Sequence, residues 1–198
     1  MKYILILIAL GAAGILLALF MMGQLSKSGT APGLVEGKLS TCPQSPNCIC
    51  TEYPEDVEHY IKPVDYGSAN IKVVRSLIRK SIDATGGSMV REKDNYFAAT
   101  YRSGTFGFVD DLEVRIDETT KQIHIRSASR IGYSDLGVNK ARALQLRTRL
   151  QKLSRLAPQS ESLFCLRAAA LRSWAAIYSR SIAPYWRSYA SGSERHNR

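Results

Sequence analysis

Residues 106–129, FGFVDDLEVRIDETTKQIHIRSAS, contain two stretches of alternating polar and apolar side chains joined by a short polar turn. The alternation predicts a strand at 106–116 and another at 122–129, and so short a link joins neighbouring antiparallel strands. Placing Ile116 opposite Ile123 determines the other cross-strand pairs, which are Val114 with Ile125, Glu113 with Arg126, and Asp110 with Ser129. The hairpin therefore predicts that opposite charges meet across the two strands.

The flanking sequence predicts two more strands and two helices. Residues 89–92 and 96–102 are rich in aromatic and branched side chains and are separated by a short turn. Apolar residues recur every three or four positions over 71–82, after a candidate cap at Ser68, and again over 138–153. We therefore predict an α+β fold, in which a four-stranded antiparallel meander packs against two helices.

The chain begins with an apolar run that contains no charge from Tyr3 to Met22. Such a run is long enough to cross the hydrocarbon layer of about 30 Å, and it exceeds the apolar core of most cleaved signals. Cleavage after the small residues at 26–28 is the alternative. We expect a single-pass anchor in a bacterial inner membrane, with the globular domain on the periplasmic, extracytoplasmic side.

Composition predicts four segments. These are a transmembrane anchor at 1–25, a flexible tether at 26–41 rich in Gly, Ser, Thr and Pro, a globular α+β domain at 42–157, and a basic, poorly ordered or loosely helical tail at 158–198. The basic residues of the 138–153 helix, Arg142 among them, are expected to form a solvated face. Contact with anionic lipid headgroups is the alternative for this helix, and the net charge of +10 is compatible with it. An exported domain rarely meets nucleic acid, so we expect none.

Three cysteines, Cys42, Cys48 and Cys50, lie in or next to a loop that contains two prolines. Such a loop can bring the Cα atoms within about 7 Å, so Cys42 can form a disulfide with either Cys48 or Cys50. A metal site that adds His59 is the alternative, but the spacing matches no zinc pattern. We expect a disulfide, no metal and no cofactor.

Residues 126–139, RSASRIGYSDLGVN, hold the densest group of polar side chains between two periodic elements. The functional hypothesis is that two arginines and the amide groups of the following helix start converge on an anionic group. The candidate ligand-binding residues are Arg126, Ser127, Ser129, Arg130, Tyr133, Ser134, Asp135 and Asn139, with Asp110, Asp111 and Glu113 as orienting acids. The structural alternative is that the acids form exposed cross-strand ion pairs with Arg126 and Arg130, that Ser134 and Asp135 bond the loop backbone, and that Asn139 caps the helix.

Asp110 falls on the apolar side of its predicted strand. It is either desolvated there or accepts hydrogen bonds from Ser127 and Ser129, unless a bulge turns it outward. An enzyme could use Asp110 as a general base and a serine within 127–134 as nucleophile, but no Gly-x-Ser-x-Gly elbow is present. We therefore favour a non-catalytic binding or scaffold domain that is anchored in the membrane through residues 3–22. Its expected partner is an anionic small molecule, a lipid headgroup or an envelope protein. A hydrolase is the alternative function.

Three blocks carry a family resemblance: CPQSPNC at 42–48, FVDDLE at 108–113, and the segment 126–139. In this order they resemble domain-of-unknown-function family 1499, which is found in bacteria and in plastid proteins. The resemblance covers residues 42 to about 154 and implies no activity. Cys50 stands where the resemblance implies a small residue such as Ser, and the chain beyond about residue 157 has no counterpart.

Overall fold

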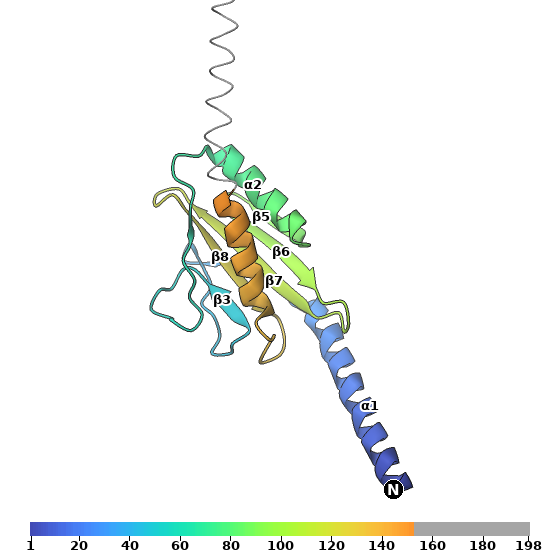
Figure 1. The fold of residues 1–198 in the computed structure, drawn as a ribbon. Helices are drawn as coiled ribbons and strands as arrows, with labels where there is room; N and C mark the ends of the chain where they lie inside the picture. The colour runs from blue at the N-terminus through green and yellow to red at the C-terminus, as the bar shows by residue number, and fades with distance from the viewer. Residues whose placement is uncertain (153–198) are drawn as a thin grey trace, which may run out of the picture. The chain divides into compact units, whose positions relative to one another are not determined.

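The computed structural model describes residues 1–152, and the predicted tail at 158–198 lies outside the described residues (Figure 1). An N-terminal helix precedes a sheet and two further helices. The elements are α1 Lys2–Leu25, the 3-10 turn η1 Ser26–Ser28, β1 Leu34–Val35, β2 Lys38–Leu39, β3 Cys48–Cys50, β4 Val64–Asp65, α2 Ile71–Ala84, β5 Ser88–Lys93, β6 Tyr96–Arg102, β7 Val109–Asp117, β8 Gln122–Ser129, and a helix over 138–152.

The main sheet is antiparallel, with the order β3-β8-β7-β6-β5, and β4 also pairs with β8. The predicted meander is confirmed as β5 to β8, but the count of four strands was too low. Strands β3 and β4 are three and two residues long, too short to show alternation. The predicted register between β7 and β8 is confirmed, because Ile116 lies opposite Ile123, and Glu113 opposite Arg126.

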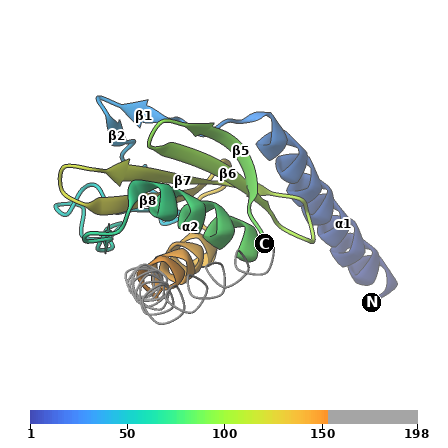
Figure 2. The ribbon, with the colours of Figure 1, turned by 90° about the horizontal axis from the view of Figure 1, so that it is seen from above.

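One face of the sheet forms the apolar core. Both α2 and the 138–152 helix lie on this face (Figures 1 and 2). Phe97, Leu112 and Ile125 of the sheet are buried completely in one cluster with Ile78 and Leu146 of the helices. Burial of large apolar side chains contributes about 1.5–3 kcal/mol for each, so this interface is the main source of stability.

Helix α2 begins differently from the prediction. Its cap is Asn70, whose side chain accepts a hydrogen bond from the backbone amide of Lys72, and not Ser68. Both residue types cap helices well. The apolar period of the helix was therefore read correctly, while its first turn was placed two residues too early.

The opposite face of the sheet is covered by residues 26–41, which were expected to form a flexible tether. They contain η1 and the β1–β2 hairpin, and Ser26 and Leu39 are fully buried. The backbone amide of Gly33 donates to Glu113 Oε1 on β7 at 2.9 Å. Residues 26–41 pack on the sheet because buried polar groups of the sheet form hydrogen bonds with them. The composition of residues 26–41 does not reveal these distant partners.

Helix α1 is long and apolar enough to cross a membrane, although a signal sequence passes the same test. Its last turn packs against the loop between β6 and β7. A Cβ atom placed on Gly23 would lie 2.0 Å from the carbonyl oxygen of Phe106, so only glycine permits this approach. Ser26 Oγ then accepts a hydrogen bond from the amide of Val109 at 3.0 Å, which joins the helix end to the sheet.

Candidate functional site

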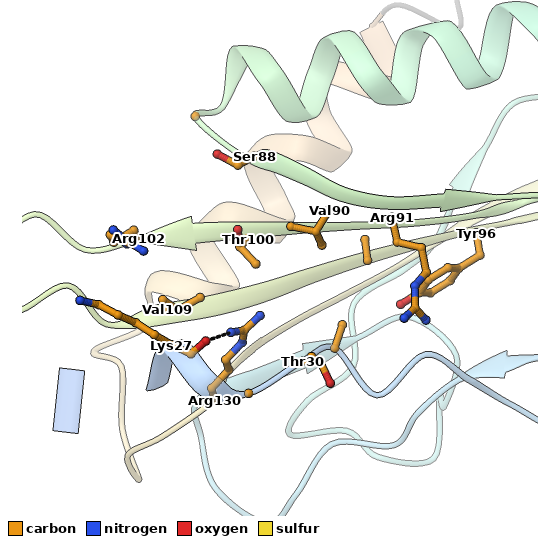
Figure 3. A pocket seen from close by; sticks show the side chains of 14 residues that line it. Lys27, Thr30, Ser88, Val90, Arg91, Tyr96, Thr100, Arg102, Val109 and Arg130 are labelled. Atoms are coloured by element: carbon orange, nitrogen blue, oxygen red, sulfur yellow. Dashed lines mark hydrogen bonds between the residues drawn. The ribbon is translucent and has the colours of Figure 1, made fainter. Parts of the chain in front are cut away.

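A cavity of about 800 Å³ lies between residues 27–31 and the outer strands of the sheet (Figure 3). We call it the cationic pocket. Its charged and hydroxyl-bearing lining residues are Lys27, Thr30, Ser88, Arg91, Tyr96, Thr100, Arg102 and Arg130. Lys27 and Arg102 lie toward one end, Arg91 and Tyr96 lie toward the other, and Arg130 lies between them (Figure 3).

The four pocket cations, Lys27, Arg91, Arg102 and Arg130, differ in their carboxylate partners within residues 1–152. Among the described residues, no ion pair within 4.0 Å involves Lys27, Arg91 or Arg102. Arg130 is different, because its Nε and Nη2 atoms donate to the two carboxylate oxygens of Asp111 at 2.8 and 2.7 Å. These bonds raise the pKa of Arg130. Within the part of the chain that the structure describes, the pocket therefore carries an uncompensated positive charge.

Beneath the covering segment, the sheet holds a layer of buried ion pairs. Arg126 Nη1 lies 3.0 Å from Glu113 Oε2, and the Glu113 side chain is fully buried. Tyr96 also donates to Glu113 Oε1 at 2.7 Å, and burial together with this bond raises the pKa of Tyr96. The pairing predicted from the register is confirmed, but the expected exposed location is wrong, because residues 26–41 exclude solvent.

The segment 126–139 does not converge on one site. Along β8 alternate side chains point to opposite faces, so Arg126 lies on the covered face while Ser127 lies toward the helices. Only Arg130 of the predicted ligand-binding residues lines the cationic pocket. Period-two alternation in β8, which was visible in the sequence, was the signal that these residues would separate.

The remaining predicted site residues have structural contacts. Asn139 is buried and does not cap the helix; its Nδ2 donates to Asn47 O at 3.0 Å and to Ser129 Oγ at 2.9 Å. Asp135 accepts hydrogen bonds from the amides of Gly137 and Asn139 at the helix start. In the same loop, Ser134 Oγ accepts from the amide of Leu136, and Tyr133 is exposed.

Arg142 completes this polar group from the 138–152 helix, where it was expected on a solvated basic face. It donates through Nη2 to Asp110 Oδ2 at 2.9 Å and through Nη1 to Ser127 Oγ at 3.2 Å. Ser127 in turn donates to Asn139 Oδ1 at 2.6 Å. Asp110 is therefore held by an arginine instead of the predicted serine hydroxyls.

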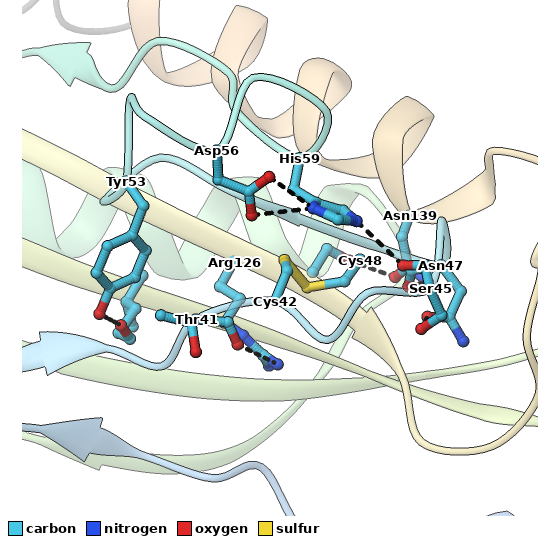
Figure 4. The surroundings of a disulfide bond; sticks show 12 residues. Thr41, Cys42, Ser45, Asn47, Cys48, Tyr53, Asp56, His59, Arg126 and Asn139 are labelled. Atoms are coloured by element: carbon cyan, nitrogen blue, oxygen red, sulfur yellow. Dashed lines mark hydrogen bonds and ion pairs between the residues drawn. A yellow bond between two sulfur atoms is a disulfide. The ribbon is translucent and has the colours of Figure 1, made fainter.

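The disulfide joins Cys42 to Cys48, with Cα atoms 5.6 Å apart (Figure 4). Cys50 is the buried free cysteine of this loop, and burial raises its pKa to about 11, so its thiol is a poor nucleophile. His59, the fourth residue of the alternative metal site, forms its contacts with other groups. Its Nδ1 lies 2.9 Å from the Asp56 carboxylate and its Nε2 lies 3.2 Å from Ser45 O, which ties two loops together.

His124 is expected to make folding sensitive to mild acid. Its Nδ1 lies 3.2 Å from Thr51 Oγ1, and burial lowers its pKa despite the nearby Glu52. The folded state resists the proton that the unfolded chain takes up, so stability is lost as the pH falls below the unfolded pKa of about 6.5. We expect the thermal midpoint of the full chain to fall between pH 7 and pH 5, and to fall less in His124→Gln. An equal fall in both proteins would contradict this role.

The fold thus defines a class: an α+β domain with an antiparallel sheet, two helices on one face, and an apolar N-terminal helix. The family described as protein of unknown function (DUF1499) matches residues 38–150. The chain belongs to this family. Comparison with curated proteins and with solved structures gave no match.

Proposed function

We propose that this chain is a membrane-anchored binding protein, and that its cationic pocket takes an anionic ligand without chemical conversion. The observation that carries the proposal is that Lys27, Arg91 and Arg102 line one cavity, and that none of them has a carboxylate partner in the described part of the chain. Like charges held together in a cavity repel each other and attract an anion. Arginine forks bind phosphate and carboxylate in particular.

The packing of α1 supports a retained anchor. Ser26 is fully buried, and its carbonyl oxygen accepts a hydrogen bond from Arg130 Nη1 at 3.2 Å. Cleavage of the chain within 26–28 would disrupt these contacts and open the pocket wall at Lys27. A helix whose end is part of the domain core is better explained as an anchor than as a removed signal.

The disulfide between Cys42 and Cys48 supports an oxidising compartment, because such bonds rarely persist in the cytosol. We place the domain on the periplasmic side of a bacterial inner membrane. Protease added to spheroplasts should degrade the domain, while intact cells should protect it. A domain that survives in spheroplasts would contradict this placement.

Anion binding is tested with the full chain in an uncharged detergent. Inorganic phosphate should raise its thermal midpoint above that in chloride at matched ionic strength, since a ligand that binds only the folded state stabilises it. Arg91→Gln with Arg102→Gln should remove most of this phosphate effect. The matched control is Lys140→Gln with Arg149→Gln, which removes the same charge from two exposed positions on the 138–152 helix. A phosphate effect equal in all three proteins, or absent in all, would contradict the proposal.

A further inference from the structure

We infer that the anion held by the cationic pocket is the headgroup phosphate of an anionic phospholipid from the bilayer that α1 crosses. This inference rests on the proposed function and adds the identity of the ligand. It depends on three observations. The pocket begins directly after α1, the end of α1 packs on the sheet, and the pocket cations that have no carboxylate partner among residues 1–152 include Lys27 and Arg102 at one end.

The pocket wall begins where the anchor ends. Helix α1 ends at Leu25, and Lys27, Gly29 and Thr30 line the cavity. A helix of 24 residues is about 36 Å long, slightly more than the hydrocarbon layer. Residues immediately after such a helix lie at the level of the lipid headgroups, and so does this end of the pocket.

The contacts between the anchor and the sheet hold the pocket at this level. Gly23 packs directly on the backbone of Phe106, and Ser26 Oγ both donates to Gly23 O at 2.7 Å and accepts from the amide of Val109. The aromatic rings of Phe106 and Phe108 contact each other edge to face in this same loop. Phenylalanine side chains can insert into the boundary between lipid headgroups and acyl chains, so this loop is compatible with a location there. With these contacts in place, the domain is joined to the helix end by packing and not by a free linker.

The charges are placed for a headgroup that enters from the bilayer. Lys27 and Arg102 lie toward one end of the pocket, and Lys27 is two residues beyond α1 (Figure 3). Thr30 and Thr100 add hydroxyl groups, which can bond a phosphate or the hydroxyls of a headgroup. An anionic phospholipid fits these features because its phosphate meets cations while its acyl chains stay beside α1. A zwitterionic lipid would bring its own cation toward them.

The test uses the full chain in nanodiscs made of phosphatidylcholine alone or with one fifth phosphatidylglycerol. Phosphatidylglycerol should raise the thermal midpoint, and Lys27→Gln with Arg102→Gln should remove at least half of this rise. Loss of two cations near an anionic surface should weaken retention of the lipid by about tenfold or more. Lys140→Gln with Arg149→Gln removes the same charge from exposed positions outside the pocket lining, and should keep the rise.

A rise that survives in the pocket variant, or falls equally in both variants, would show general surface attraction and overturn the inference. A rise in no protein would also overturn it. Inorganic phosphate added to nanodiscs of phosphatidylcholine alone then separates the two proposals. If phosphate stabilises the chain through the pocket while phosphatidylglycerol does nothing, the ligand is a soluble anion and the proposed function stands. If neither acts through the pocket, both proposals fail.

Discussion

Glu113→Gln is expected to lower the free energy of unfolding by about 3–5 kcal/mol, because it leaves the charge of Arg126 buried without its partner. Glu113 is fully buried and accepts hydrogen bonds from Gly33, Tyr96 and Arg126. Glutamine keeps the shape and one acceptor oxygen, but its NH2 group replaces the second oxygen, so the variant removes the charge and one of the two acceptors. Denaturant unfolding of the full chain in dodecyl maltoside measures the change.

Two further variants make this result specific. Glu113→Gln combined with Arg126→Met removes both charges and should recover part of the lost stability, because no buried ion then remains unpaired. Glu92→Gln breaks an ion pair with the exposed Arg79 and should have little effect. A loss in Glu113→Gln no larger than that in Glu92→Gln would contradict a buried ionic layer.

Arg142→Leu is expected to cost about 3 kcal/mol, the second largest effect. Its guanidinium bonds Asp110, Ser127 and Asn139, and it lies over the ring of Tyr101 with 4.3 Å from Cζ to the ring centroid. Leucine fills the space but leaves the Asp110 carboxylate unpaired in a site with little exposure. The measurement is again denaturant unfolding in detergent.

The matched control is Arg149→Leu on the same helix, where the side chain is exposed and the expected change is small. Asp110→Asn combined with Arg142→Leu should recover part of the loss. If Arg142→Leu and Arg149→Leu behave alike, Arg142 belongs to a solvated basic face, as the sequence had suggested.

The cationic pocket shows why the candidate site was only partly predictable. Its wall at residues 27–31 and its floor on β6 lie about seventy residues apart, and Arg91 and Arg102 carry no local signal that distinguishes them from other surface arginines. Arg130 was predicted as a ligand-binding residue, but within a group of residues that the sheet divides between its two faces. The many polar side chains at 126–139 correctly marked a segment rich in buried polar contacts, but they do not form a single site.

The sequence alone determined the elements whose side chains follow a local period. Alternation over 106–129 was sufficient to predict the β7–β8 register, apolar spacing was sufficient for α2, and the uncharged run at 3–22 was sufficient for α1. These features are local because a strand or helix places each side chain by its position along the chain.

Only the tertiary structure decided how residues 26–41 pack, where the buried ion pairs lie, and which cysteine joins Cys42. Each of these depends on partners far away in the chain, such as Glu113 for Gly33. A buried polar group is stable only when a partner meets it, and that partner is supplied by the folded sheet, not by neighbouring residues. The apolar N-terminal helix was therefore readable from composition, whereas the pocket beside its end required the fold.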